Sequence, residues 1–206
     1  MSEKPGVLIL SGFLGAGKTM LLMQIVPYLR QKHGEDYSVA IIENEIGAAA
    51  VDAGIIGQAG YSVTNMLSGC VCCTLVGELV PTLRSIEGDL APNLVILEAT
   101  GMAEPSGMMK AITEYAGNEV RLLTIIDSVR WPRIAVPLHN LLSSQIAPAA
   151  ALCVNKTDKV SPDEANAVLA DVREMNPTAA VALGSAAESL SAECLEALLG
   201  GIDGRA

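Results

Sequence analysis

The sequence predicts an α/β fold, in which helices cover both faces of a mostly parallel sheet and form a three-layer sandwich. Short apolar runs alternate with segments of helical periodicity along the chain. Within these runs polar residues do not alternate with apolar ones, which is typical of strands buried on both faces. Half of the 206 residues are apolar, enough for one full-sized core. We therefore expect a single domain over residues 1–206, with no separate C-terminal domain.

Six apolar runs are the predicted strands. They cover residues 6–10, 37–43, 94–98, 120–127, 150–155 and 179–183. Apolar residues recur at helical spacing after Thr19, which predicts a helix between the first two strands. Ser161 and Glu164 match a capping box, with Pro162 in the first turn of the helix. A last helix is expected over about 189–199, before two glycines. Strand and helix in this order predict right-handed crossovers and a ligand site at the carboxyl edge of the sheet.

Composition excludes several classes of function. The formal net charge is -10 and the 13 Lys and Arg residues are scattered, which argues against a nucleic-acid partner. No apolar stretch reaches the roughly 18 residues that a membrane-spanning helix needs, so we expect no membrane interaction. Five cysteines are few and odd in number for a secreted disulfide scaffold. The sequence therefore predicts a cytoplasmic protein with reduced thiols, in which Cys153 and Cys194 are inert residues of the core.

The segment "GFLGAGKT", residues 12–19, matches the phosphate-loop pattern between a predicted strand and a predicted helix. Its glycines let backbone N–H groups wrap around phosphate oxygens. Lys18 would reach the β and γ phosphates, and the Thr19 hydroxyl would bind Mg²⁺. The fold class is therefore that of a P-loop NTPase. The residues predicted to bind the phosphates are Gly12, Gly15, Ala16, Gly17, Lys18, Thr19 and Met20.

The segment "NKTD" follows a late buried strand and predicts recognition of guanine. The Asp158 carboxylate can accept hydrogen bonds from the ring N–H and the exocyclic amine of guanine, a pair that adenine does not offer. A base that leaves this carboxylate desolvated and unpaired is rejected. Lys156 can lay its aliphatic stem along the base, and Asn155 can brace the loop. GTP is the nucleotide that this pattern indicates.

Acidic residues end two further strands. Glu98, in "LEATG", is a candidate for the Mg²⁺ site, and the Gly101 N–H could bind the γ phosphate. The alternative for Glu98 is a cap of the next helix. Asp127 ends the following strand, and a role in the site or as a helix cap is equally compatible with its position.

The segment "GCVCC" places Cys70, Cys72 and Cys73 within four positions. Adjacent cysteines form only a strained disulfide ring, so a structural disulfide is disfavoured. Three interpretations stay open: a thiolate site for a soft metal ion such as Zn²⁺, a redox-sensing cluster, and a buried turn of small residues. Glu43 and Glu45 end the second predicted strand, and either could complete the metal site or serve Mg²⁺.

Five motifs in order, "GFLGAGKT", "ENEIG", "GCVCC", "ILEATGMAEP" and "NKTD", resemble those of the CobW-type GTPases, metallochaperone-like relatives of the hydrogenase and urease accessory GTPases. The resemblance covers about residues 5–200. It implies Mg²⁺-dependent GTP hydrolysis and a transition-metal site, for Zn²⁺ or Co²⁺, at the three cysteines. It also implies a client metalloenzyme or cofactor-assembly protein as partner, and it allows a homodimer. Arg130 stands where some relatives carry a histidine, and Met20 where a second threonine is usual.

The sequence thus predicts a slow GTPase that couples Mg²⁺–GTP binding to transition-metal binding at the cysteine loop. The predicted catalytic residues are Lys18, Thr19 and Glu98. The predicted metal ligands are Thr19, Glu43, Glu45, Cys70, Cys72, Cys73 and Glu98. The alternative function is a nucleotide-switched assembly factor for a cofactor-dependent enzyme, with structural or redox-sensing cysteines.

Overall fold

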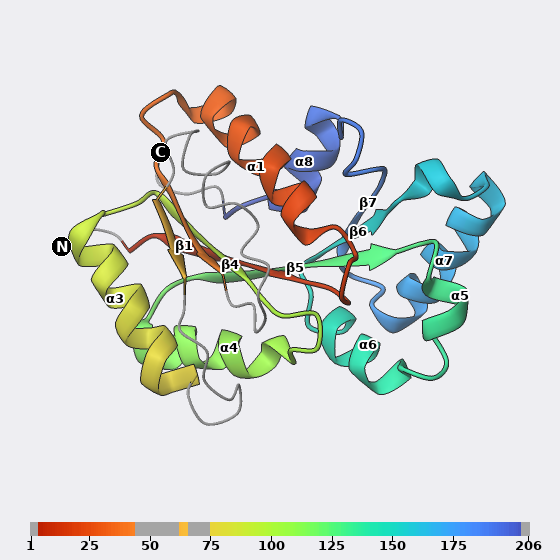
Figure 1. Ribbon diagram of the computed structural model, residues 1–206, viewed down its shortest axis with the longest axis horizontal. Helices are drawn as coiled ribbons and strands as arrows, with labels where there is room; N and C mark the ends of the chain where they lie inside the picture. The colour runs from red at the N-terminus through yellow and green to blue at the C-terminus, as the bar shows by residue number, and fades with distance from the viewer. Residues whose placement is uncertain (1–3, 44–61, 66–74, 203–206) are drawn as a thin grey trace.

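The computed structural model describes residues 4–43, 62–65 and 75–202. In this part of the chain, seven strands form one parallel sheet in the order β3-β2-β4-β1-β5-β6-β7 (Figure 1). The strands are β1 Gly6–Ser11, β2 Val39–Glu43, β3 Ser62–Asn65, β4 Leu94–Glu98, β5 Val120–Asp127, β6 Ala151–Asn155 and β7 Ala180–Leu183. The predicted three-layer α/β sandwich is confirmed.

Helices α1 and α8 cover one face of the sheet, and α3, α4, α6 and α7 cover the other (Figure 1). The α-helices are α1 Lys18–His33, α3 Val80–Asp89, α4 Pro105–Ala111, α5 Trp131–Ile134, α6 His139–Ile146, α7 Pro162–Met175 and α8 Ala192–Leu199. The short π-helices η1 Leu75–Leu79 and η2 Ile112–Ala116 and the 3-10 helix η3 Thr157–Lys159 complete the described elements. None of the helices in the described ranges has the length and apolar character needed to cross a membrane.

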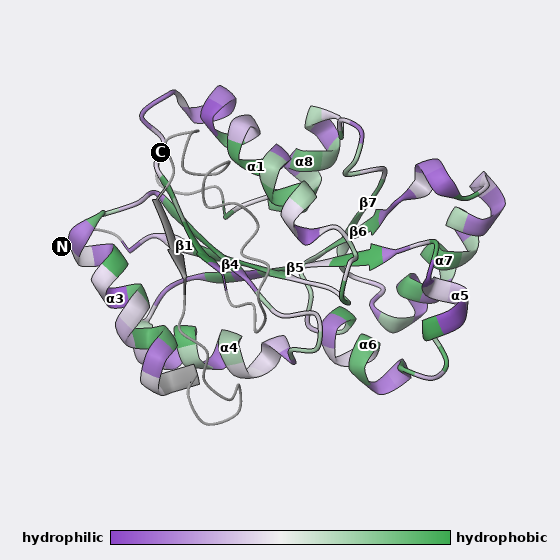
Figure 2. Cartoon of the chain, viewed as in Figure 1, coloured by the Kyte–Doolittle hydropathy of each residue, from purple (hydrophilic) through white to green (hydrophobic). Residues whose placement is uncertain are grey.

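The two faces of β1 build two separate cores. Leu8 and Leu10 pack against α1 and α8, whereas Val7 and Ile9 pack against the helices of the opposite layer. Side chains along a strand alternate between the faces of a sheet, so one continuous apolar run supplies both cores. Figure 2 shows this apolar character along the central strands. β1 lies between β4 and β5, and the chain that follows it leaves from the middle of the carboxyl edge.

Two element starts differ from the predicted ones by two or more residues, and one strand was not predicted. The second strand begins at Val39 and not at residue 37, because the Asn93 side chain binds the backbone N–H and hydroxyl of Ser38 in the preceding turn. The last helix begins at Ala192, because the Ser191 hydroxyl caps it. β3 was not predicted, since its four residues, "SVTN", contain no apolar run. The predicted capping box of α7 is present: Ser161 and Glu164 exchange side-chain to backbone hydrogen bonds.

Cys153 lies in the middle of β6 and is fully buried. Its burial, together with the neighbouring Cys194, raises the pKa of the Cys153 thiol to about 12. The structure therefore agrees with the prediction of an inert core thiol at this position, because the reactive form of cysteine is the thiolate.

The raised pKa predicts how stability depends on pH. The folded protein keeps the Cys153 proton up to about pH 12, whereas the unfolded chain releases it near the ordinary pKa of 9.0. The unfolded state thus binds fewer protons in this window, so the thiol's contribution lowers the free energy of unfolding as pH rises. Between about pH 8 and 10, the free energy of unfolding of the wild type should fall by on the order of 1 kcal/mol more than that of Cys153→Ala. Urea unfolding at the two pH values measures this difference. Identical losses in the two proteins would contradict this assignment.

Candidate functional site

The phosphate loop connects β1 to α1, and two of its glycines are required by close contacts. Gly12 has φ +138°, and a Cβ there would overlap the Ile125 carbonyl on β5. Gly17 has φ +107°, and a Cβ there would overlap the Asn155 side-chain amide on β6. Both the backbone conformation and the space therefore exclude a side chain. The loop is therefore packed tightly against β5 and β6.

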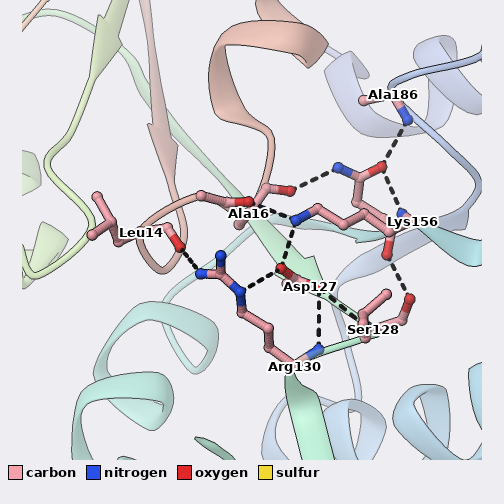
Figure 3. A network of polar contacts seen from close by, with 10 residues as sticks. Leu14, Ala16, Asp127, Ser128, Arg130, Lys156 and Ala186 are labelled. Atoms are coloured by element: carbon pink, nitrogen blue, oxygen red, sulfur yellow. Dashed lines mark hydrogen bonds and ion pairs between the residues drawn. The ribbon is translucent and has the colours of Figure 1, made fainter. Parts of the chain in front are cut away.

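Three consecutive carbonyl groups of the loop each accept a hydrogen bond from a side chain that lies far away in the sequence (Figure 3). The pairs are Arg130 to Leu14, Lys156 to Gly15 and Asn155 to Ala16, each over 2.7 Å. In a trans peptide the N–H points opposite to the C=O. Fixing these carbonyls therefore fixes the direction of the N–H groups that follow them, which are the groups a phosphate loop offers to its ligand.

Asn155 is the most connected of these donors. It ends β6 and is 2% exposed. While its amide nitrogen binds Ala16, its Oδ1 atom accepts the backbone N–H of Lys156 at 2.8 Å and of Ala186 at 2.7 Å. A single buried side chain thus joins the phosphate loop, the "NKTD" segment and the chain after β7.

Two carboxylates and a hydroxyl lie on the other side of the phosphate loop. The Thr19 hydroxyl donates to the Glu98 carboxylate, at 3.2 Å from Oε1 and 3.4 Å from Oε2. Glu43 is paired in register with Glu98 on the adjacent strand. Oxygen ligands of this kind fit Mg²⁺, which prefers carboxylates and hydroxyls. Lys18 is buried at the start of α1, and its Nζ atom donates to the Gly12 carbonyl at 3.3 Å.

The chain that follows Glu98 packs against the phosphate loop. A Cβ on Gly101 would overlap the backbone of Leu14, so this position also needs glycine. The Gln145 amide, from α6, donates to the carbonyls of Gly101 at 3.2 Å and Ala103 at 3.0 Å. Gln145 is 1% exposed, so it holds this segment from the interior.

The remaining predicted residues are placed less closely around the loop. Asp158 lies in η3, two residues after Lys156, and its side chain is exposed. Met20 lies in the first turn of α1 and is 48% exposed. Glu45 and the three cysteines of the "GCVCC" segment lie outside the described residues. Within the described residues, no three His, Cys, Asp or Glu side chains converge into a metal-binding group.

The sequence prediction missed three residues that the structure brings to the site: Arg130, Gln145 and Asp127. Arg130 was noted only as a departure from relatives, and Asp127 was left undecided between site and cap. The structure gives Asp127 both roles, because Oδ1 accepts the N–H groups of Val129 and Arg130 while Oδ2 pairs with Lys156. Strand alternation could have indicated it, since Leu123 and Ile125 of the same strand face α1.

A phosphate loop between the central strand of a parallel sheet and its flanking helix defines the P-loop class of nucleotide-binding proteins. The family then follows from the sequence. Residues 6–182 match the family model described as CobW/HypB/UreG, nucleotide-binding domain, and the chain belongs to this family of GTPases.

Two curated relatives and one solved structure show the extent of the similarity. The chain is 32% identical over 162 residues to the zinc chaperone YjiA of Escherichia coli (strain K12), covering 74% of this chain and 49% of that protein. It is 27% identical over 216 residues to the zinc chaperone CobW of Pseudomonas aeruginosa, covering 84% and 54%. The crystal structure of Zn(II)-bound YjiA GTPase from E. coli superposes with a TM-score of 0.65 at 21% identity, over 97% of this chain and 63% of that one. The chain spans about half the length of these curated relatives.

The packing of Gly17 against Asn155 gives a test with a matched control. Gly17→Ala must displace the buried amide, whereas Gly117 is also in the left-handed region, at φ +76°, and a Cβ there would make only an ordinary contact with Lys4 at 3.5 Å. Urea unfolding should show that Gly17→Ala lowers the free energy of unfolding by about 2 kcal/mol more than Gly117→Ala does. Equal effects of the two substitutions would mean that the loop is not held by this contact.

Proposed function

We propose that this chain binds and hydrolyses GTP and couples Mg²⁺–GTP binding to transition-metal binding at Cys70, Cys72 and Cys73. The observation that carries the proposal is the set of hydrogen bonds between the "NKTD" segment and the phosphate loop. Asn155 and Lys156, of the segment expected to recognise guanine, hold consecutive carbonyls of the phosphate loop. A base-recognition segment joined in this way to a phosphate loop supports binding of one nucleotide across both.

Guanine selection is assigned to Asp158. Its carboxylate is exposed on η3 and therefore accessible to a ligand, while the preceding Lys156 is fixed by the phosphate loop. Lys156 itself has φ +66°, a conformation that few side chains adopt without support from their surroundings. The fixed Lys156 limits where Asp158 can lie relative to the phosphates.

Hydrolysis is assigned to the opposite side of the loop. Lys18 lies at the start of α1, where its ammonium group can neutralise phosphate charge. Thr19 and Glu98 lie 3.2 Å apart and would hold Mg²⁺, which would supply neutralisation of phosphate charge. Gln145 is buried and its amide nitrogen holds the carbonyls of Gly101 and Ala103, so we assign it to positioning this segment and not to orienting water. We therefore propose slow turnover that the metal or a partner accelerates.

The metal cargo is assigned to the cysteine segment. β3 ends at Asn65, which is paired in register with Glu43, and Cys70 follows five residues later. Cys70, Cys72 and Cys73 lie outside the described residues but follow this strand closely in the sequence, which supports coupling between the metal and the edge that carries Glu43 and Glu98. Thiolates favour soft ions, and the relatives named zinc chaperones make Zn²⁺ the first candidate before Co²⁺. Glu45 could complete the site.

This function requires a client metalloprotein and a reducing compartment such as the cytoplasm, which keeps the three thiols available. We propose the described fold as one GTPase domain, with a homodimer as one state in which it could act.

Asp158→Asn tests base recognition. Removing the charge should weaken Mg²⁺–GTP binding at least about tenfold and leave the much weaker ATP binding unchanged, because the second acceptor oxygen is lost. Calorimetric titration with both nucleotides measures this, and Asp163→Asn, an exposed acid in the first turn of α7, is the matched control. Equal affinities of the wild type for GTP and ATP would rule out guanine selection.

Metal coupling is tested by measuring GTP affinity with and without one equivalent of Zn²⁺. We expect at least about a fivefold difference, which the triple variant Cys70→Ser, Cys72→Ser, Cys73→Ser abolishes while it retains GTP binding. If Zn²⁺ leaves the affinity of the wild type unchanged, the coupling is refuted and the nucleotide-switched assembly factor becomes the better account.

A further inference from the structure

The carboxylate of Asp127 is buried and fully engaged at the end of β5. Its side chain is 1% exposed. Oδ1 accepts the backbone N–H groups of Val129 at 3.1 Å and Arg130 at 3.2 Å. Oδ2 lies 2.6 Å from Lys156 Nζ and 3.5 Å from Arg130 Nε. Two of these contacts are hydrogen bonds from the backbone of the following turn, and two are ion pairs with side chains.

Both ion-paired cations continue to the phosphate loop, as Figure 3 shows. Arg130 donates to the Leu14 carbonyl and Lys156 to the Gly15 carbonyl, each over 2.7 Å. One buried negative charge therefore orients two positive groups onto adjacent peptides of the loop. The negative charge also offsets the repulsion between the two positive groups, which lie close to each other around the same oxygen.

The strand register explains why Asp127 can do this. Asp127 is paired with Asn155, the residue before Lys156, so the acid and the lysine follow from adjacent strand ends. Lys156 is only 24% exposed in its side chain. Without the Asp127 carboxylate, the Lys156 ammonium group would retain its hydrogen bond to the Gly15 carbonyl. It would, however, be a partly desolvated positive charge without its counter-charge, which is unfavourable.

We infer that Asp127 is a positioning residue of the nucleotide site: it holds Lys156 and Arg130 on the phosphate loop and so sets the loop's geometry for guanine nucleotides. This inference rests on the proposed function. The competing explanation is a purely local role, in which Asp127 only caps the turn at Val129 and Arg130. Asp127→Asn separates the two, because asparagine keeps an acceptor oxygen for the turn and removes the charge.

The test is steady-state GTP hydrolysis and GDP titration with the full chain. Asp127→Asn should raise KM for GTP and Kd for GDP about tenfold, with kcat within about threefold, because loop geometry contributes to binding both nucleotides. The control is Asp171→Asn. The Asp171 carboxylate accepts the Trp131 indole N–H at 2.8 Å, next to Arg130, but has no contact with the loop. It should leave both constants unchanged.

A double-mutant cycle with Lys156→Met gives the second readout. Asp127→Asn should raise KM by less than about threefold in the Lys156→Met background, because its principal partner is gone. Additive effects, or unchanged KM and Kd in Asp127→Asn, overturn the inference and leave the local cap. If Asp127→Asn does not fold, Arg130→Met tests the same network, since Arg130 is about half exposed. An unchanged KM in that variant also overturns it.

The outcomes separate the two proposals. A wild-type chain that binds no guanine nucleotide refutes the proposed function and this inference together. A wild type that binds GTP and an Asp127→Asn variant that binds it equally well refute only the inference.

Discussion

The hydrogen bond from the Asn155 amide to the Ala16 carbonyl connects the phosphate loop to a strand that begins more than 130 residues later. The same side chain accepts the Lys156 and Ala186 N–H groups, so three segments depend on one buried amide. A buried amide left without these partners would be strongly unfavourable, which makes the arrangement specific as well as stabilising. Asp127 adds ion pairs with Lys156 and Arg130, which hold the neighbouring carbonyls of the loop. The shape of the loop is thus imposed by side chains of β5 and β6 and not by its glycines alone.

The strand order divides the site into two halves. β1 lies between β4 and β5, so the loop that follows it has Glu98 on one side and Asp127 on the other. The β5 and β6 side carries Asn155, Lys156 and Asp158, which we propose recognise guanine. The β4 and β2 side carries the carboxylates that suit Mg²⁺, and it continues at Asn65 into the segment with the three cysteines. Gly101, which follows Glu98, packs against the loop on this second side.

The motifs that could be predicted from sequence are those whose physics is local. The phosphate loop, the capping box at Ser161 and the buried strands each depend on residues within a few positions of one another. Arg130 and Gln145 could not be placed in this way, because their partners lie 116 and 44 residues away and depend on strand order and helix packing. Strand alternation indicates the face of Asp127, but not its partner Lys156, which lies 29 residues away. β3 was missed because an edge strand of four residues with two polar hydroxyls carries little apolar signal. The roles of Glu45 and the three cysteines stay predictions.

Amide hydrogen exchange of the nucleotide-free protein tests most directly whether the Asn155 amide holds the site together. The Ala186 N–H donates to Asn155 Oδ1 at 2.7 Å, so its exchange rate reports on this contact. The account predicts slow exchange at Ala186 in the wild type and exchange at least about tenfold faster in Asn155→Ala, with the protection of β1 retained. Equal exchange rates at Ala186 in the two proteins would contradict it.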